Sequence, residues 1–396
     1  MGGGSLPDAK LVVVGSGGTE SGGSEGKGFY TINGNSFIQV TEPSFDQAPF
    51  PHNGIGFNTT DDINEPKWAV VGDPIGQSID SSNTGFYSSN GIDWDVIQDV
   101  SFFWNDSGDN GYGWNSIASD GSKTWVAVGR TPAFTGLSIT TSSIDSSNSW
   151  ISFDDIGDGV PNRIYLFNTI DYYDEHWICV GQRNDDETGG INLGGVWVSN
   201  TTNPIGVWAF QNDTSNQYYE YKGVGYDTSG RWMVVGQDNS GQNNGKAFYS
   251  NQKITNPFDS SWTQIDNSLV DASNTTWSDA DYSPDHNRWV IVGSDNSSFP
   301  TKGKIVYNDS GDLSTWNSAD TTTDPDLSGF LFASSVVWDN NFNKFFAAGS
   351  ITNSSFTTNG VILESSDGIT WQKSGSTYDD ISGLGFLGIA SSSPNL

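Results

Sequence analysis

The chain of 396 residues contains one cysteine and few basic residues. It has 16 Lys and Arg against 47 Asp and Glu, which gives a formal net charge of −31 at pH 7. The single cysteine, Cys179, excludes an intramolecular disulfide. The deficit of basic residues excludes a nucleic-acid surface, because binding to phosphates depends on many Lys and Arg. So negative a chain is also repelled by anionic membranes. Neutral or cationic partners are therefore expected.

Long hydrophobic runs and catalytic motifs are missing as well. No stretch approaches the roughly 18 apolar residues of a membrane span. The first apolar run, 11–14, follows no basic segment and is shorter than the apolar part of an export signal, about 7 to 15 residues. The sequence has no HExxH, CxxC, Walker or GxSxG motif, and its three histidines and one cysteine argue against a zinc site. We therefore expect neither membrane insertion nor a signal peptide.

Glycine and aromatic residues are abundant and follow a repeat. The chain has 48 Gly and 16 Trp, and aromatic residues make up 13% of it, enough to build a core. A bulky apolar residue, two or three small or β-branched residues and a glycine recur seven times. The closing glycines lie 52 to 57 residues apart, at Gly15, Gly72, Gly129, Gly181, Gly236, Gly293 and Gly349. Such a period indicates a repeat architecture.

Each unit is interpreted as four strands. The run that ends in glycine does not alternate apolar with polar residues, so it is predicted to be a strand buried on both faces. A run with small residues at alternate positions precedes it, for example at 53–57, 115–119, 222–226 and 387–391. A hairpin with an Asn-Gly or Asp-Gly turn follows it, for example at Asn33-Gly34, Asn90-Gly91 and Asp367-Gly368. These units predict an all-β fold over 1–396, a single seven-bladed β-propeller domain with four antiparallel strands per blade.

The two ends of the chain complete this pattern. The first unit begins at its buried strand, around 10–15, with no inner strand before it, and a spare inner strand lies at 386–391. Pairing these two segments closes the ring and leaves no open sheet edge. We therefore expect truncation at either end to break the ring.

One repeated turn resembles a known family. The segment from Ser365 to Trp371, with Asp367, Gly368 and a closing tryptophan, resembles the Asp-box turn of the BNR and sialidase-like propellers, shortened by one residue. The wider repeat is similar to that of the photosystem II assembly factor family and of propeller proteins in phage and large-virus particles. The resemblance spans the whole chain and implies a fold rather than a chemistry. Only five arginines are present and the Phe-Arg-Ile-Pro motif is absent, which argues against sialidase activity.

Departures from the repeat mark a candidate ligand site on the face where ligands usually bind to propellers. Aromatic rings can stack on sugar faces while carboxylates and amides take the hydroxyl groups. In the alternative interpretation, Phe102 and Phe103 pack into the junction between two blades, and Trp104 covers them. The tentative ligand-binding residues are Phe102, Phe103, Trp104, Asp109, Tyr112, Trp114, Arg130 and Arg183.

An aromatic residue or histidine opens most of the inner strands, and two interpretations are open. These side chains could ring the mouth of a central channel, or they could pack between blades, which we favour. They are His52, Trp114, Phe167, Tyr221, Trp277 and Phe386, and Ala333 breaks the series.

Three inner-strand positions that are small in other units carry aspartate, at Asp171, Asp279 and Asp281. Carboxylates that face a channel repel one another unless they bind cations or water. These residues are therefore tentative metal ligands, and a solvated channel is the alternative. No cofactor is expected, with calcium as the one exception.

The composition and the lack of catalytic motifs favour a non-enzymatic virion structural or recognition protein, such as a phage or virus tail, fibre or capsid-associated propeller. Its expected partners are other virion subunits or a host surface glycan, and its expected location is the virion, released by lysis. One alternative is a glycan-active, sialidase-like hydrolase that uses the channel carboxylates. Another is an assembly chaperone like the photosystem factor.

Overall fold

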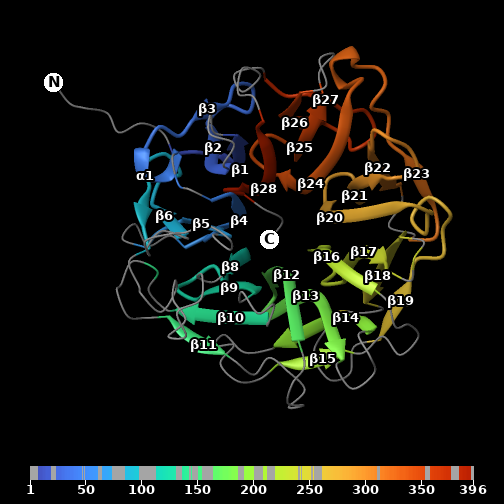
Figure 1. The fold of residues 1–396 in the computed structure, drawn as a ribbon, viewed down its shortest axis with the longest axis horizontal. Coiled ribbons are helices and arrows are strands. Elements are labelled where there is room, and N and C mark those ends of the chain that lie inside the picture. The colour runs from blue at the N-terminus through green and yellow to red at the C-terminus, as the bar shows by residue number, and fades with distance from the viewer. Residues whose placement is uncertain are drawn as a thin grey trace.

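A computed structural model gives the fold (Figure 1). The residues that it describes are 8–18, 24–46, 48, 50–60, 65–73, 85–97, 113–130, 136–141, 144, 150–153, 164–185, 191–199, 208–211, 219–239, 241, 243–250, 253, 261–309, 313–352, 357–375 and 383–393.

Hydrogen bonding groups the strands into seven antiparallel sheets of four strands each. From the inner to the outer strand, the first three sheets are β28 (Gly385–Ser391), β1 (Leu11–Gly18), β2 (Ser24–Thr31) and β3 (Ile38–Gln39); β4 (His52–Phe57), β5 (Trp68–Gly72), β6 (Gly85–Ser88) and β7 (Asp95–Val96); and β8 (Gly113–Ser119), β9 (Trp125–Arg130), β10 (Gly136–Thr141) and β11 (Ile151–Phe153).

The other four sheets follow in chain order. They are β12 (Ile164–Tyr173), β13 (His176–Asp185), β14 (Ile191–Ser199) and β15 (Ala209–Gln211); β16 (Tyr219–Tyr226), β17 (Trp232–Asp238), β18 (Asn244–Ser250) and β19 (Trp262–Gln264); β20 (Thr275–Ser283), β21 (Arg288–Asp295), β22 (Lys302–Asn308) and β23 (Trp316–Ser318); and β24 (Phe330–Asp339), β25 (Lys344–Thr352), β26 (Thr358–Ser365) and β27 (Gln372–Lys373). Two short helices, α1 (Pro43–Asp46) and η3 (Pro325–Leu327), lie in connections.

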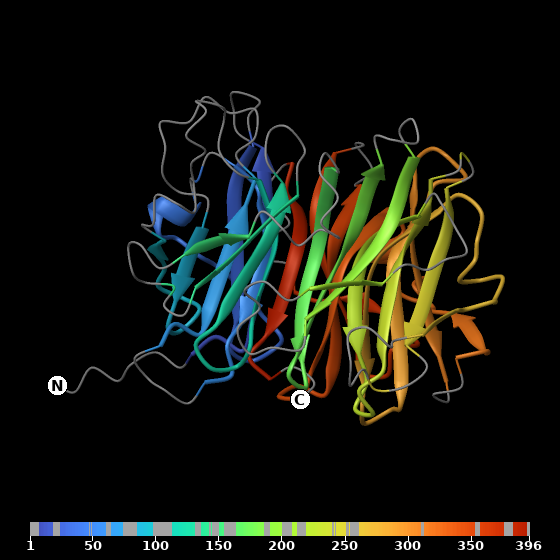
Figure 2. The same cartoon turned by 90° about the horizontal axis from the view of Figure 1, so that it is seen from below.

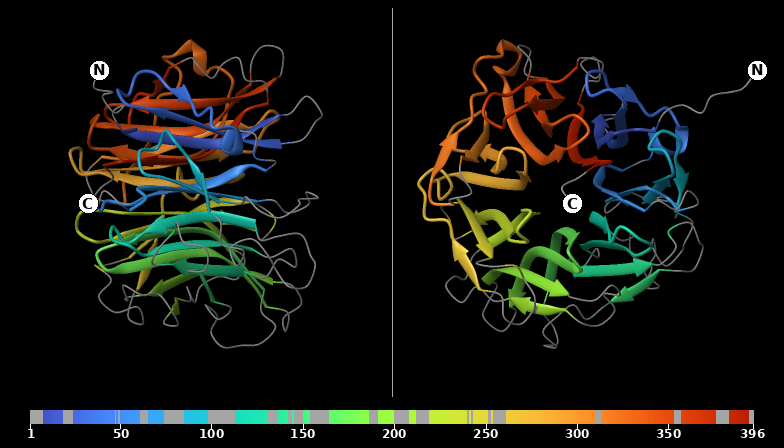
Figure 3. Two further views of the ribbon diagram at one scale, coloured as in Figure 1. Left: turned by 90° about the vertical axis from the view of Figure 1, so that its left-hand side faces the viewer. Right: turned by 180° about the vertical axis from the view of Figure 1, so that it is seen from behind.

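The sheets are arranged around a central axis, and the inner strands β28, β4, β8, β12, β16, β20 and β24 lie nearest to it (Figure 1). Seen from the side, the inner strands run along this axis (Figures 2 and 3). The prediction of an all-β propeller with four antiparallel strands per blade is confirmed. Neither described helix is long and apolar enough to cross a membrane.

The two ends of the chain meet in one sheet, as the sequence predicts. Strand β28 pairs antiparallel with β1, and Leu11 lies opposite Ser391. Because β1 also pairs with β2, the first sheet contains strands from both ends of the chain. This pairing closes the ring.

The second strand of each sheet is buried on both faces, which explains its continuous apolar sequence. In β5 every residue from Trp68 to Gly72 is buried. The large rings that recur at the start of this strand and after the hairpin turn fill the space between neighbouring sheets. Trp68, Trp125, Trp177, Trp289 and Trp371 are at most 1% exposed. The repeated tryptophans are therefore packing residues.

Each repeat glycine lies opposite a β-bulge in the neighbouring inner strand. In β16 the pairing register shifts between Tyr221 and Gly223, so Lys222 is an extra residue opposite Gly236 and Val235. The bulge brings the carbonyl oxygen of Glu220 over Gly236, where a Cβ atom would lie only 1.9 Å from that oxygen. At the other six repeat glycines a Cβ atom would lie 2.0 to 2.3 Å from a carbonyl oxygen of the inner strand or, at Gly72, from that of Pro51 directly before it. Glycine is needed here because the backbones approach so closely.

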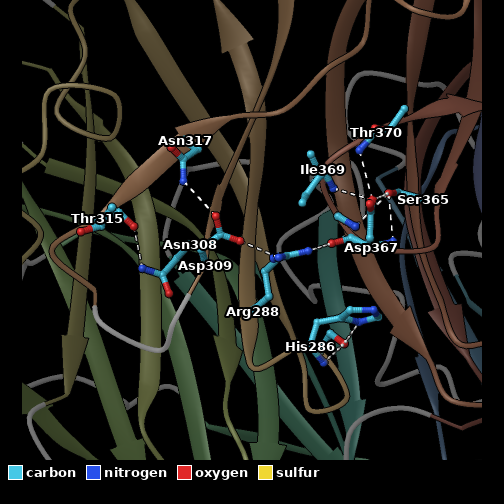
Figure 4. Close-up of polar contacts among 12 residues, drawn as sticks. His286, Arg288, Asn308, Asp309, Thr315, Asn317, Ser365, Asp367, Ile369 and Thr370 are labelled. Carbon is cyan, nitrogen blue, oxygen red and sulfur yellow. Dashed lines mark hydrogen bonds and ion pairs between the residues drawn. The ribbon is translucent and has the colours of Figure 1, made fainter.

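The hairpin turns after the third strand have one geometry in the three places where the structure describes them. At 365–371 the Ser365 hydroxyl accepts a hydrogen bond from the Gly368 amide at 2.8 Å, and Asp367 accepts one from the Ile369 amide at 2.9 Å (Figure 4). Gly368 has φ of +74°, which favours glycine. The turns at 31–36 and 88–93 repeat these contacts.

Arg288 joins this turn to the preceding blade (Figure 4). Its guanidinium donates to Asp309 Oδ1 at 2.5 Å and to the carbonyl oxygen of Asp367, and it lies 5.2 Å from the centroid of the Tyr307 ring. The side chain is buried between two blades. Arg288 is thus a structural link and not an anion-binding residue.

Candidate site in the central channel

The inner strands enclose a cavity of about 640 Å³ on the ring axis. Every inner strand contributes lining residues, because each strand faces the axis along one edge. The three channel aspartates are among these residues, with several Asn, Ser and Thr side chains. The sequence thus placed Asp171, Asp279 and Asp281 correctly at the channel.

The predicted ligand-binding residues do not gather at this cavity. Trp114 is 0% exposed and packs in the core between blades, so its assignment to a ligand site was wrong. Arg130 and Arg183 end up in β9 and β13, and their side chains lie outside the described part of the structure. Also outside the described residues are Phe102, Phe103, Trp104, Asp109 and Tyr112.

The residues that open the inner strands pack between blades, as the favoured interpretation predicts. Each lies opposite a repeat glycine at the bulge; Trp277, for example, pairs with Gly293. All are fully or almost fully buried: His52, Trp114, Phe167, Tyr221, Trp277, Ala333 and Phe386.

The series contains two ionisable residues, Tyr221 and His52, and only His52 can carry a positive charge. Its Nε2 atom donates to the carbonyl oxygen of Phe45 at 3.0 Å, while the buried Nδ1 atom has no hydrogen-bond partner among the described residues. Rings of Phe45, Phe50 and Phe86 surround it. Burial lowers the pKa of His52 from 6.5 to about 4. The folded protein therefore holds this histidine neutral.

We expect His52 to make the protein less stable in mild acid. The unfolded chain binds a proton at pKa 6.5 and the folded chain only at about 4, so stability is lost as the pH falls through that interval. Between pH 7 and 4.5 the loss should be about 2 to 3 kcal/mol. Urea unfolding at both pH values should show a smaller acid loss for His52→Phe than for the wild type. The control is His286→Gln, at a half-buried histidine; an equal acid loss in all three proteins would contradict this account.

Two of the channel aspartates bind the neighbouring blade. Asp279 Oδ2 accepts hydrogen bonds from Ser335 Oγ at 2.9 Å and the Val336 amide at 3.0 Å, both on β24. Asp281 Oδ2 accepts one from the Trp338 amide at 2.6 Å on the same strand. These bonds satisfy amides on the free inner edge of β24. The carboxylates thus join two blades as well as facing the channel.

Asp171 occupies the same register position on β12 as Asp281 on β20 but makes fewer bonds. Asp171 lies three residues after the bulge residue Asn168 and pairs with Ile178. In the same way, Asp281 lies three residues after Ser278 and pairs with Val290. Its Oδ1 atom accepts a hydrogen bond from the Tyr172 amide at 2.7 Å. Its Oδ2 atom accepts none from any described residue, so this oxygen is available to a ligand.

The surroundings favour the protonated form of two of these acids. Burial, with a smaller contribution from the nearby charges of Asp281 and Asp279, raises the pKa of Asp171 to about 8, against the effect of the hydrogen bond from the Tyr172 amide. Burial raises the pKa of Asp279 to about 7, against the effect of its hydrogen bonds. At neutral pH the channel thus holds a protonated acid in Asp171 and a second carboxyl group, that of Asp279, which titrates near neutrality.

The tentative metal site at Asp171, Asp279 and Asp281 is not supported. In the described part of the chain, no three His, Cys, Asp or Glu side chains are grouped so that they could hold a metal ion. Asp171 lies on β12 and the other two on β20, with β16 between these strands in the ring. Each oxygen of Asp279 and Asp281 also accepts a hydrogen bond from a backbone amide, which leaves at most one lone pair per oxygen.

A set of asparagines at the bulges was not predicted from the sequence. Asn53, Asn115 and Asn168 are the extra residues of β4, β8 and β12, and all three line the cavity. The signal was an asparagine directly after the aromatic residue or histidine that opens these strands. It could be recognised only once the bulge was known.

Neither a protein-family model nor a curated protein sequence matches this chain. Among solved structures, the fold is similar to a hypothetical selenium-binding protein from Sulfolobus tokodaii, with a TM-score of 0.60, 8% identity, and 99% of this chain and 95% of that chain covered. It is also similar to the GH74 xyloglucanase from Xanthomonas campestris, with a TM-score of 0.53, 9% identity and 93% of this chain covered, but only 55% of that chain. An α-L-arabinofuranosidase from Fusarium graminearum gives a TM-score of 0.46, 12% identity and coverage of 96% and 93%.

At these identities the similarity establishes the β-propeller fold alone. The expectation of a non-enzymatic virion protein is not borne out, since the fold is shared with an enzyme, the GH74 xyloglucanase. The phage and virus context and the Asp-box relationship are not supported by these neighbours. Structurally, the chain is a β-propeller with neighbours among glycoside hydrolase propellers.

Proposed function

We propose that the protein is a glycan-active hydrolase whose reaction takes place in the central channel, with Asp171 as general acid and Asp279 as general base. The observation that carries the proposal is the cavity of about 640 Å³, into which three carboxyl groups project from two inner strands. One of them, Asp171, has an oxygen that accepts no hydrogen bond from the described residues, so it can reach a substrate.

The chemistry needs a protonated acid and an ionised base on opposite sides of a glycosidic bond. Asp171 would donate its proton to the leaving-group oxygen as the bond between that oxygen and the anomeric carbon breaks. Asp279 would take a proton from the attacking water, whose oxygen forms the new bond. Asp281, held by backbone amides, adds the charge that helps to keep the proton on Asp171.

We also infer that the seven four-stranded sheets are seven blades of one propeller, the number that the sequence predicts. The sheet that joins the two chain ends has the same four-strand order as the other six, and its inner strand β28 borders the cavity as theirs do. In this count each blade contributes one strand to the reaction chamber.

The proposal predicts a loss of activity in Asp171→Asn. The purified chain should release reducing ends from a panel that includes xyloglucan, arabinan and other neutral polysaccharides. Asp171→Asn should lower kcat by about 10²- to 10⁴-fold, the usual contribution of a general acid. The rate should be greatest between pH 7 and 8, because Asp279 must lose its proton above about 7 while Asp171 must keep its own below about 8.

The control is Asp95→Asn, at an exposed aspartate on the outer strand β7. This variant should keep the wild-type rate. If the wild type hydrolyses none of the panel, or if Asp171→Asn is as active as Asp95→Asn, the proposed function is wrong.

A further inference from the structure

The bulge asparagines of three neighbouring blades share one orientation. Asn53 Nδ2 donates to the carbonyl oxygen of Trp114 at 3.0 Å, Asn115 Nδ2 to that of Phe167 at 2.7 Å, and Asn168 Nδ2 to that of Tyr221 at 2.7 Å. Each bond runs from one blade to the next in the same direction around the ring. The carbonyl acceptor fixes which end of the amide carries the nitrogen, since a carbonyl can only accept.

The amide oxygens of these residues have no such partner. No described residue donates a hydrogen bond to the Oδ1 atom of Asn53, Asn115 or Asn168. All three side chains are half-buried and line the cavity. An amide oxygen only accepts, so these atoms need donors from water or from a ligand.

The rest of the ring does not continue this pattern. The equivalent residues are Lys222, whose Nζ lies 3.5 Å from Glu220 Oε1, Ser278, Ser334 and Leu387. The Ser334 hydroxyl lies within hydrogen-bond distance of two carbonyl oxygens, those of Phe386 at 2.7 Å and Ala348 at 3.1 Å. The bulge asparagines are thus confined to one side of the channel, on β4, β8 and β12.

We infer that Asn53, Asn115 and Asn168 form an amide arc that binds the hydroxyl groups of a neutral saccharide, an inference that rests on the proposed function. Hydroxyl groups supply the donors that the arc lacks, and an anionic sugar would meet three acceptors in a strongly acidic chain. Asn168 precedes Asp171 by three residues on one strand, which places the arc roughly 10 Å from the acid along the channel. A saccharide would therefore enter past the arc, at the end where the inner strands begin.

The test measures binding apart from turnover. Full-length Asp171→Asn is titrated calorimetrically with neutral xyloglucan-, arabino- and cello-oligosaccharides, in the presence of EDTA. Adding Asn115→Ala or Asn168→Ala should weaken binding about 5- to 10-fold each, the effect of losing one or two neutral hydrogen bonds. The matched control is Ser334→Ala, which removes an inter-blade hydrogen bond at the equivalent ring position but should change affinity less than 2-fold.

The outcomes separate this inference from the proposed function. If an oligosaccharide binds through the arc but the wild type cleaves none of them, the arc stands and the hydrolase is wrong. If the wild type hydrolyses a polysaccharide but the asparagine variants weaken binding no more than Ser334→Ala does, the arc is wrong and the hydrolase stands. No binding of any of these oligosaccharides in the presence of EDTA would also overturn the arc.

Discussion

Removal of the last inner strand should abolish cooperative folding. A chain that ends at Gly383 lacks β28 and with it the pairing that closes the ring on β1. It also loses the buried side chains of Leu384, Phe386 and Ile389 from the core between blades. Deleting one buried Leu, Ile or Phe side chain to alanine costs about 2 to 5 kcal/mol. The combined loss matches or exceeds the 5 to 15 kcal/mol that stabilises most folded proteins.

Near-UV circular dichroism and urea unfolding test this expectation. The truncated chain should lose the sharp tryptophan signal and the cooperative transition, and a synthetic peptide of residues 383–396 should restore both. The control is a chain that ends at Ser393, which keeps β28 and the described hydrogen bonds around it. A cooperative transition of unchanged midpoint in the chain that ends at Gly383 would show that ring closure is not needed.

The fold was predictable because the same physical device recurs in each unit. A glycine under a carbonyl oxygen and a ring between sheets restrict the amino acid at fixed places in every unit, and a tight turn at Asn-Gly or Asp-Gly does so in three of them. Seven repetitions made those restrictions visible, and the spare inner strand at 386–391 identified the closure. The bulge itself could not be predicted, because its extra residue is Asn, Lys, Ser or Leu in different units.

The site was predictable only in part, because its contacts cross between blades. The repeat placed Asp279 and Asp281 on the inner strand, but their partners Val336 and Trp338 are each 57 residues farther along the chain. No periodicity reveals which side chain reaches the next blade and which does not. The difference between Asp281 and Asp171, at equivalent positions, therefore emerges only from the structure. Trp114 was wrongly assigned to the ligand site for a related reason. The sequence alone does not show whether an aromatic residue at the start of an inner strand is exposed or buried.

The largest effect of a single substitution should occur at a repeat glycine. In Gly236→Ala the new Cβ atom would lie 1.9 Å from the carbonyl oxygen of Glu220 and 2.8 Å from the Cα atom of Tyr221. Both are backbone atoms of the bulge, so no side-chain rotation can relieve the clash. Overpacking in a core typically costs 1 to 3 kcal/mol, and a backbone clash this close should cost about 3 kcal/mol or more.

The matched control for Gly236→Ala is Gly385→Ala, in which the nearest atom to the new Cβ would be the Ser350 hydroxyl oxygen at 3.3 Å. Because a hydroxyl can rotate away, this substitution should cost less than about 1 kcal/mol in urea unfolding. Equal stabilities of the two variants would mean that the inner strand can slide away from the second strand. The bulge would then be a flexible feature, and the glycine repeat would need another explanation. A large loss confined to Gly236→Ala would instead show that the bulge is rigid, as an amide arc held at fixed positions around the channel requires.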